Sequence, residues 1–232
     1  VRGLSWKDAA GIPHRTDCDA VALGWHLRPE TQLAELAGCE FAWDALTRQW
    51  LPRIDEDGRI ATRGVYLAGD GARVLGADAA EDNGRLAAFA ALADLGLPVE
   101  PSRPPRLRER LANHRRFADA LARAYPWPAH LATTMPDETL LCRCEGLTAG
   151  QLRETAKDTG ACELNRAKAL MRVGMGRCQG RFCGHAAAEV LAAAGGIPPE
   201  TVGRLRAQAP VKPLAIATDA LPPPSEPEAQ GR

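Results

Sequence analysis

Apolar residues in the first part of the chain fall into short runs with a glycine at or next to their end. Residues 19–24 and 64–70 are two such runs, and each is followed by a turn signal, which predicts buried strands there. Residues 50–60 alternate apolar and polar positions around Asp57-Gly58, a dipeptide that favours tight turns. We therefore predict a hairpin over 50–60.

Two segments of the same part have the spacing of helices. Residues 30–36 suit a short helix between the predicted strands, and the alanine-rich segment 77–95 stops at Gly96, with Pro98 just beyond. Strands that alternate with helices indicate an α/β layer. We expect this layer to occupy residues 1–97.

The chain is then rich in proline over 101–105, after which apolar residues recur at helical spacing between Leu107 and Leu121. Arginines lie on the other side of this helical pattern. The pattern predicts an amphipathic helix, within a helical connector over 98–136. We expect its arginines to form a solvated surface.

A third region has clear helix-start signals. Residues 148–151 match the capping box, and Leu147 with Leu152 supplies the hydrophobic staple around it. This helix should end near Gly160, because glycine adopts the left-handed conformation that closes helices.

Two more short helices are predicted over 163–173 and 180–194, the second closed by glycines and prolines. We therefore expect a small all-α domain over 137–217. Residues 218–232 are rich in proline, glutamate and glycine and contain too little apolar surface to offset the cost of ordering, which predicts a disordered tail.

Charge and hydropathy narrow the class of function. Lysine and arginine number 29, as do aspartate and glutamate, so the net charge is zero and gives no reason to expect a nucleic-acid or anionic-membrane partner. No apolar run reaches the length of about 20 residues that crosses a bilayer, and the first residues contain no signal-peptide core. We expect a cytoplasmic protein without a transmembrane segment.

Cysteines are the chemically most distinctive residues. An odd number, seven, in a chain without a secretion signal favours reduced thiols and a metal site over disulfides. Four of them form two close pairs, Cys142-Arg-Cys144 and Cys178-x4-Cys183, among glycines that let the backbone bend. The other three are expected to be small buried apolar side chains: Cys18, Cys39 and Cys162.

The spacing within the pairs bears on the metal. Four thiolates suit both iron and zinc, but structural zinc sites commonly use Cys-x2-Cys, which is absent from these pairs. A two-iron cluster can take each pair on its own iron. Predicted helix starts near Cys144 and Cys183 would favour an anionic cluster. His185 is a possible substitute ligand, although a packed role is expected, and a zinc site or unmetallated thiols stay open at this point.

Three sequence segments resemble a known family. Cys142-Arg-Cys-Glu, Thr148-Ala-Gly-Gln-Leu and the segment 174–184 are similar to the bacterioferritin-associated-ferredoxin-like (BFD-like) [2Fe-2S] domain, in the form appended to flavoprotein subunits. The resemblance covers about residues 137–214. It implies that the cluster ligands are Cys142, Cys144, Cys178 and Cys183.

Another segment resembles flavoproteins. Residues 62–70, Thr-Arg-Gly-Val-Tyr-Leu-Ala-Gly-Asp, are similar to the second flavin signature of the two-dinucleotide-domain reductases, and 19–24 resembles an accompanying strand. The resemblance implies that Asp70 binds the ribityl chain of FAD and that Gly69 lets the backbone approach.

The Gly-x-Gly-x-x-Gly loop of such domains does not occur in these 232 residues. FAD binding therefore requires a further N-terminal segment, and we expect the chain to be an N-terminally truncated fragment.

Together these resemblances imply an α/β flavoprotein segment, part of a two-dinucleotide-domain fold, followed by a small all-α [2Fe-2S] domain. They point to the FAD-containing subunit of the hydrogen cyanide synthase, opine oxidase and hydroxyproline dehydrogenase group. Such a subunit passes on electrons that a second flavoprotein subunit takes from an amine or amino acid, with the acceptor unspecified. The alternative is a non-enzymatic metal-binding module, with zinc or [2Fe-2S], that recruits a partner protein.

Overall fold

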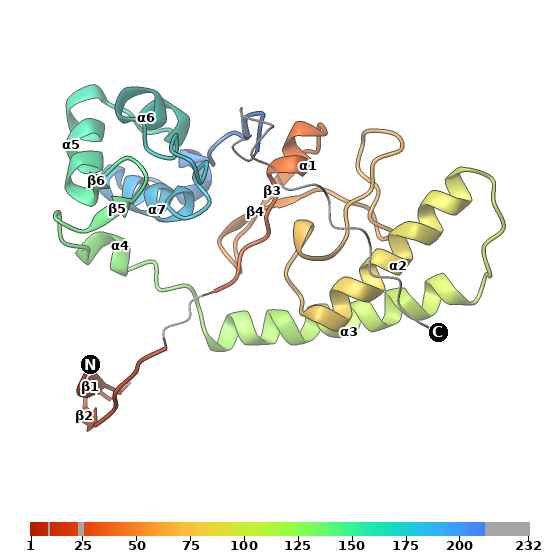
Figure 1. Ribbon diagram of the computed structural model, residues 1–232, viewed down its shortest axis with the longest axis horizontal. Coiled ribbons are helices and arrows are strands. Elements are labelled where there is room, and N and C mark those ends of the chain that lie inside the picture. Colours follow the sequence, from red (N-terminus) through yellow and green to blue (C-terminus); the bar gives the residue numbers. More distant parts are fainter. Residues whose placement is uncertain (9, 23–25, 212–232) are drawn as a thin grey trace, which may run out of the picture.

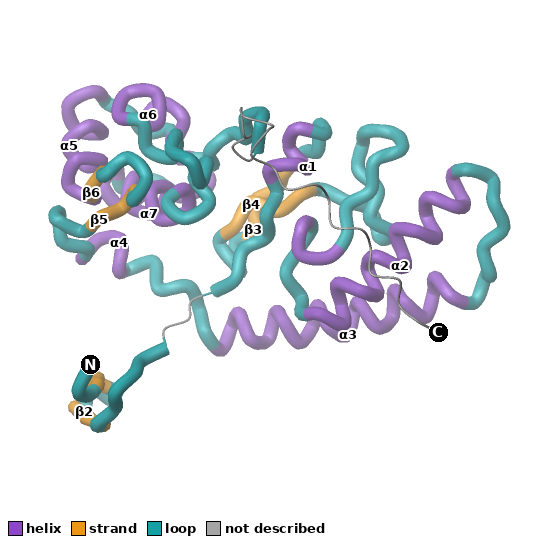
Figure 2. The backbone as a smooth tube through the Cα atoms, viewed as in Figure 1, coloured by secondary structure: helices purple, strands orange, loops and turns teal. Residues whose placement is uncertain are grey.

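The structure is a computed structural model in which residues 1–8, 10–22 and 26–211 are described. Figure 1 shows three parts: a separate hairpin at the N-terminus, a middle part with two long helices side by side, and a group of short helices. Figure 2 shows how much of the middle part is loop. The strands are β1 Leu4–Lys7, β2 Pro13–Thr16, β3 Phe41–Asp44, β4 Gln49–Pro52, β5 Leu140–Cys142 and β6 Leu147–Thr148.

The helices of the first two parts are α1 Gln32–Leu36, the 3-10 helix η1 Gly69–Gly71, α2 Ala77–Asp94 and α3 Arg103–Ala124. Those of the third part are α4 Leu131–Thr134, α5 Ala149–Thr159, α6 Leu164–Met171, α7 Gly184–Gly195 and α8 Pro199–Val202. Within the described residues, no helix is long and apolar enough to cross a membrane.

The two long helices pack along one another. Their shared core contains Leu86 of α2 with Leu107 and Leu111 of α3, and the buried Asp82 carboxylate lies 2.9 Å from the guanidinium of Arg110. The amphipathic helix predicted after the proline-rich stretch is therefore confirmed, and it shares a core with α2. The predicted domain boundaries at 97, 136 and 217 stay predictions.

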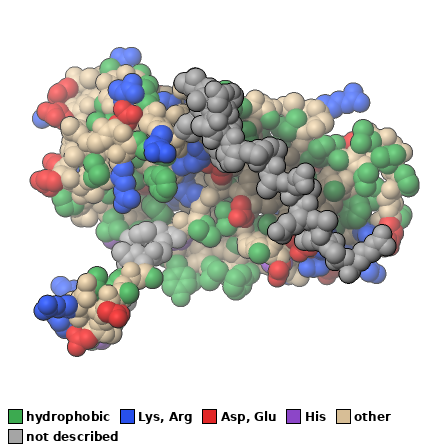
Figure 3. Space-filling model, viewed as in Figure 1, with side chains coloured by type: hydrophobic (Ala, Val, Ile, Leu, Met, Phe, Trp, Pro, Cys, Tyr) green, Lys and Arg blue, Asp and Glu red, His purple; other side chains and the backbone are tan. Residues whose placement is uncertain are grey.

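The α3 surface away from this core is partly apolar. Phe117, Leu121 and Tyr125 are exposed on it, and apolar side chains gather over α3 along the lower edge of the molecule in Figure 3. The helix α3 therefore has two exposed surfaces: the arginine-rich side that was predicted to be solvated, and this apolar side.

The prediction of buried strands in the first part is wrong. Residues 19–22 form no strand, and their side chains are exposed. Leu23 and Gly24 lie outside the described residues. In 64–70 only Tyr66 is paired, in a single bridge to Arg59, before Gly69 turns the chain into η1. Val65 and Leu67 still pack against the small core around α1, so these two side chains are partly buried although no strand forms.

The hairpin lies elsewhere than predicted. The strand β4 pairs with β3, which precedes it, and not with residues that follow. The turn at Asp57-Gly58 does form: the Gly58 amide donates to Asp55 O at 3.3 Å, and Gly58 has φ +89. Among the described residues, all three sheets are two-stranded and antiparallel, so the α/β expectation holds only coarsely.

The third part follows the helix signals closely. Thr148 and Gln151 form the predicted capping box, and Gly160 closes α5 in the left-handed conformation. The helix α7 begins at Gly184, later than the predicted 180, because residues 172–183 form a loop. The domain is also not wholly helical, since β5 and β6 pair beside α5. The predicted tail, 218–232, lies outside the described residues.

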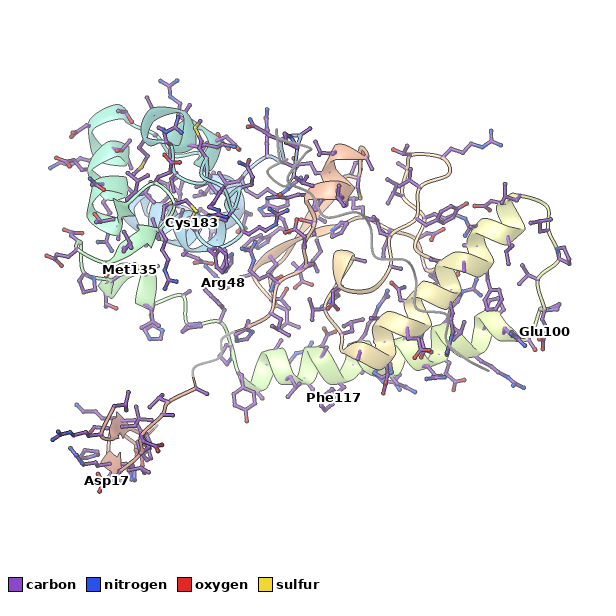
Figure 4. The ribbon with its side chains drawn as sticks, in the orientation of Figure 1. Asp17, Arg48, Glu100, Phe117, Met135 and Cys183 are labelled. Atoms are coloured by element: carbon purple, nitrogen blue, oxygen red, sulfur yellow. The ribbon has the colours of Figure 1, made fainter. Side chains whose placement is uncertain are left out.

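Long-range polar contacts join this third part to the middle one. The Arg48 guanidinium donates to both carboxylate oxygens of Glu189, at 3.0 and 2.7 Å, and Arg204 pairs with Glu35 at 2.7 Å. Figure 4 shows Arg48 at the border between β3–β4 and the helices around Cys183. These contacts fix one part against the other.

Replacing Arg48 with alanine is expected to lower the free energy of unfolding by about 3 kcal/mol, because the Glu189 side chain, only 6% exposed, would keep a buried charge without a partner. Urea denaturation followed by circular dichroism measures this. The matched control is Arg103→Ala, whose pair with Glu100 is more than half exposed on both sides and should contribute about 0–1 kcal/mol. Equal losses in the two variants would contradict the role given to the buried pair.

Candidate metal centre

The two cysteine pairs meet at one cavity. Its volume is about 260 Å³, and its wall combines the four predicted ligands with two arginines and a phenylalanine. The lining residues are Cys142, Arg143, Cys144, Arg177, Cys178, Phe182 and Cys183. The structure therefore brings together all four thiols that the sequence predicts as ligands.

Each pair is positioned by a different local structure. Cys142 ends strand β5, and Cys144 lies in the turn between β5 and β6. Cys178 lies in the loop before α7, and Cys183 is the N-cap residue of α7, not part of its first turn as predicted. The free amides at the start of α7 consequently lie beside a cavity that would hold an anionic group.

Glycine is required where the two cysteine loops touch. A Cβ atom added to Gly176 would lie 2.1 Å from the Cβ of Cys144, far inside contact distance. Gly174 and Gly180 have φ of +79 and +78, and a Cβ on either would lie within 2.4 Å of Leu205. The loop thus closes over Leu205 on one side and over Cys144 on the other.

Thiols of different pairs affect one another's ionisation. Cys142 acts to raise the pKa of Cys183, and Cys144 acts to lower the pKa of Cys178. The sequence interpretation placed each pair together on one iron. Which two thiolates share an iron stays a prediction.

Burial and neighbouring sulfurs govern the protonation of these thiols. Desolvation, with the added repulsion of Cys142 and Cys178, raises the pKa of Cys183 to about 12. Desolvation also acts to raise the pKa of Cys178, but hydrogen bonds from the Phe182 amide and its neighbours outweigh it and leave this pKa below its usual value. Metal binding would offset the cost of ionising the buried thiol, because a bound cation stabilises thiolates.

The donor set fits a [2Fe-2S] cluster. Four free thiols line one cavity, and backbone amides donate to the sulfur of Cys178. A two-iron cluster asks for two thiolates at each iron, with sulfides bridging the irons.

The remaining cysteines and His185 lie outside this cavity. Cys39 is buried as predicted, but Cys162 is exposed in the loop between α5 and α6, so the buried role predicted for it is wrong. The His185 ring packs against Trp127, with ring centroids 4.6 Å apart. Desolvation, together with Arg28 and Arg48, lowers the pKa of His185 to about 3, so it is a neutral packed side chain.

The predicted flavin residues lie in the middle part, at a turn. Gly69 has φ +59, and its amide donates to Asn83 Oδ1 of α2 at 2.8 Å. Asp70 follows on η1 with its side chain exposed. The turn leads into α2, as the resemblance implies, although no strand precedes it.

The segment that contains the four cysteines matches a known domain family. Residues 140–193 match the BFD-like [2Fe-2S] binding domain. The match spans the helices α5, α6 and most of α7 and contains all four cysteines of the cavity. It confirms the domain predicted from the sequence and its [2Fe-2S] cofactor, while the individual ligands stay predictions.

The chain is also similar to named oxidoreductase subunits. It is 43% identical to the A subunit of opine oxidase from Agrobacterium tumefaciens (strain Ach5), with 82% of this chain and 38% of that protein covered. It is 31% identical to the HcnB subunit of hydrogen cyanide synthase from Pseudomonas aeruginosa, with 91% and 46% covered. The chain thus spans less than half the length of these relatives. These similarities confirm the group of proteins predicted from the sequence.

Among solved structures, L-proline dehydrogenase from P. horikoshii has the same fold over 91% of this chain and 41% of that chain. The TM-score is 0.69, at 22% sequence identity. The likeness shows a shared fold over most of this chain.

Sequence reasoning missed several contributors to the cavity. The wall includes Arg143, Arg177 and Phe182, and Leu205 supports the loop from a distant part of the chain. The two arginines and Phe182 directly neighbour the cysteines, so this proximity could have indicated them. Leu205 carries no such signal.

Proposed function

We propose that this chain is part of an electron-transferring flavin and iron-sulfur subunit of a heteromeric amine or amino-acid dehydrogenase or oxidase. The observation that carries the proposal is the convergence of four free cysteines at one cavity within the BFD-like domain. The second support is the similarity to the opine oxidase A subunit, and to HcnB, across most of the chain.

The cysteines act as cluster ligands in this proposal. Cys142 and Cys183, which are buried, would hold the cluster from the protein side, and Cys144, which is exposed, would hold it from the solvent side. The amides around Cys178 donate to its sulfur and stabilise the thiolate. When bound, a [2Fe-2S] cluster carries one electron at a time. No acid or base is needed for this step, and none is assigned.

The middle part contributes to a flavin site. Gly69 and Asp70, at the start of η1, would contact FAD, whose pyrophosphate requires a further segment that these residues do not supply. Flavin takes two electrons from a donor and passes them on singly, so a one-electron centre on the same polypeptide suits it. We likewise propose that FAD is a cofactor of the protein and that the protein is cytoplasmic.

The substrate would be oxidised on another polypeptide. The relatives are named as subunits of an opine oxidase and a hydrogen cyanide synthase, which supports a second flavoprotein subunit that oxidises an amine or amino acid. This chain would then pass electrons to an acceptor.

The test is anaerobic purification of the full-length protein with its accompanying subunits. We expect two irons and two sulfides per chain, a paramagnetic signal after reduction, bound FAD, and bleaching of the visible band when amino acids or opines are added. Stoichiometric zinc in place of iron would contradict the cluster and favour the recruiting module. Iron without bleaching by any such substrate would contradict the dehydrogenase role.

A further inference from the structure

One face of the BFD-like domain joins an exposed aromatic ring to two arginines beside the cysteines. Phe182 is 83% exposed, although it lies in the loop that bears Cys178 and directly precedes Cys183, which is buried. Arg143 and Arg177 are exposed as well, and both line the same cavity as Phe182. We refer to Arg143, Arg177 and Phe182 as the cluster face.

The exposure of Phe182 has no structural explanation within the described residues. A phenylalanine ring left in water forgoes about 1.5–3 kcal/mol of burial, and the fold has nearby apolar side chains that are fully buried, such as Val173 and Leu191. Exposed aromatic rings of this kind are typical of surfaces that another protein covers.

The two arginines have no ion-pair partner among residues 1–8, 10–22 and 26–211. Other arginines of the same domain are paired: Arg172 with Glu145 at 2.9 Å, and Arg181 with Glu30 at 2.6 Å. The cluster face therefore presents free guanidinium groups around an apolar centre. Arginine and aromatic residues are enriched at the energetic centres of protein interfaces.

We propose that the cluster face docks an acidic surface of the substrate-oxidising subunit, with Phe182 inserted in an apolar pocket and Arg143 and Arg177 paired with carboxylates around it. This inference rests on the proposed function, since it names the surface through which the electron arrives. Cys144 lies exposed on the same face, so docking there brings the donor close to the cluster ligands. With the cluster bound, the reduced flavin of that subunit would pass its two electrons to the cluster one at a time, each leaving for the acceptor before the next arrives.

A competing explanation is that the arginines serve only to stabilise the negative charge of the cluster. It predicts that their removal shifts the midpoint potential and leaves binding between the two polypeptides unchanged. If the cluster face docks the other subunit, removal of the arginines weakens binding between the two polypeptides. The remaining binding also depends less on salt, because the lost contacts are between charges on two proteins.

The test compares Phe182→Ala and the double variant Arg143→Ala/Arg177→Ala in the full-length chain. Affinity for the separately purified substrate-oxidising subunit is measured by biolayer interferometry at several salt concentrations, and cluster reduction by substrate in stopped flow. We expect affinity at least about tenfold weaker in each variant, a flatter salt dependence in the double variant, and an unchanged visible spectrum of the cluster.

The matched controls lie away from the cavity. Leu170→Ala removes an apolar side chain of α6 that is 43% exposed, and Arg106→Ala/Arg115→Ala removes two exposed arginines of α3; both variants should bind with wild-type affinity. Unchanged affinity in the cluster-face variants, or a change in midpoint potential alone, would overturn the docking proposal. Wild-type protein that binds the substrate-oxidising subunit without cluster reduction by substrate would instead overturn the proposed function, since the affinity measurement tests docking separately.

Discussion

Replacing Cys142 with serine is expected to abolish the iron-sulfur cluster. Cys142 is 1% exposed, and it lines the buried side of the cavity together with Cys183. A serine oxygen is a poorer ligand for iron than a thiolate, and no spare cysteine lies in the cavity to replace it. We expect iron content and the visible absorption to fall at least about tenfold, in line with the loss of a ligand that organises a site.

Cys162→Ser is the matched control. It removes a thiol of the same domain that is exposed and does not line the cavity, so iron content should stay at the wild-type level. Far-ultraviolet circular dichroism of both variants separates cluster loss from unfolding. Equal loss of iron from the two variants would refute the ligand assignment.

Replacing Gly176 with alanine is expected to have almost as large an effect, although glycine binds no metal. The new Cβ would lie 2.1 Å from the Cβ of Cys144, and 3.3 Å from its Cα, so the two loops must separate. If the two cysteine loops separate, they cannot hold both cysteine pairs at one cavity. We expect iron content to fall at least about tenfold, since displacements of about 1 Å are enough to disable a preorganised site.

Gly195→Ala provides the comparison within the same domain. Its added Cβ would meet Ile197 at an ordinary contact distance of 3.5 Å, at the end of α7. This variant should bind iron normally. Full iron content in Gly176→Ala would show that the loops can move apart without loss of the cluster, contrary to the geometry.

Helix positions in the BFD-like domain could be read from the sequence because their signals are local. The capping box at 148–151 and the closing Gly160 act over three or four residues, and both were predicted and observed. The start of α7 was placed too early because Gly180 belongs to a loop whose shape depends on Leu205, more than twenty positions away.

The strands of the middle part show the opposite case. Residues 64–70 are apolar enough for a buried strand, yet Val65 and Leu67 reach the core around α1 from an irregular segment. An apolar run reports that side chains are buried and does not specify the hydrogen-bond partner of the backbone. The choice of β3 as the partner of β4 likewise depended on tertiary packing.

By itself, the sequence determined the kind of donor: the residue types and spacing of Cys142, Cys144, Cys178 and Cys183 favour a thiolate-bound metal, because coordination depends on which donor atoms are present. Only the tertiary structure decided that both cysteine pairs line one cavity, that Gly176 must lie against Cys144, and that Phe182 stays in solvent. These features arise from contacts between segments that are distant in sequence, so the local spacing of residues cannot predict them.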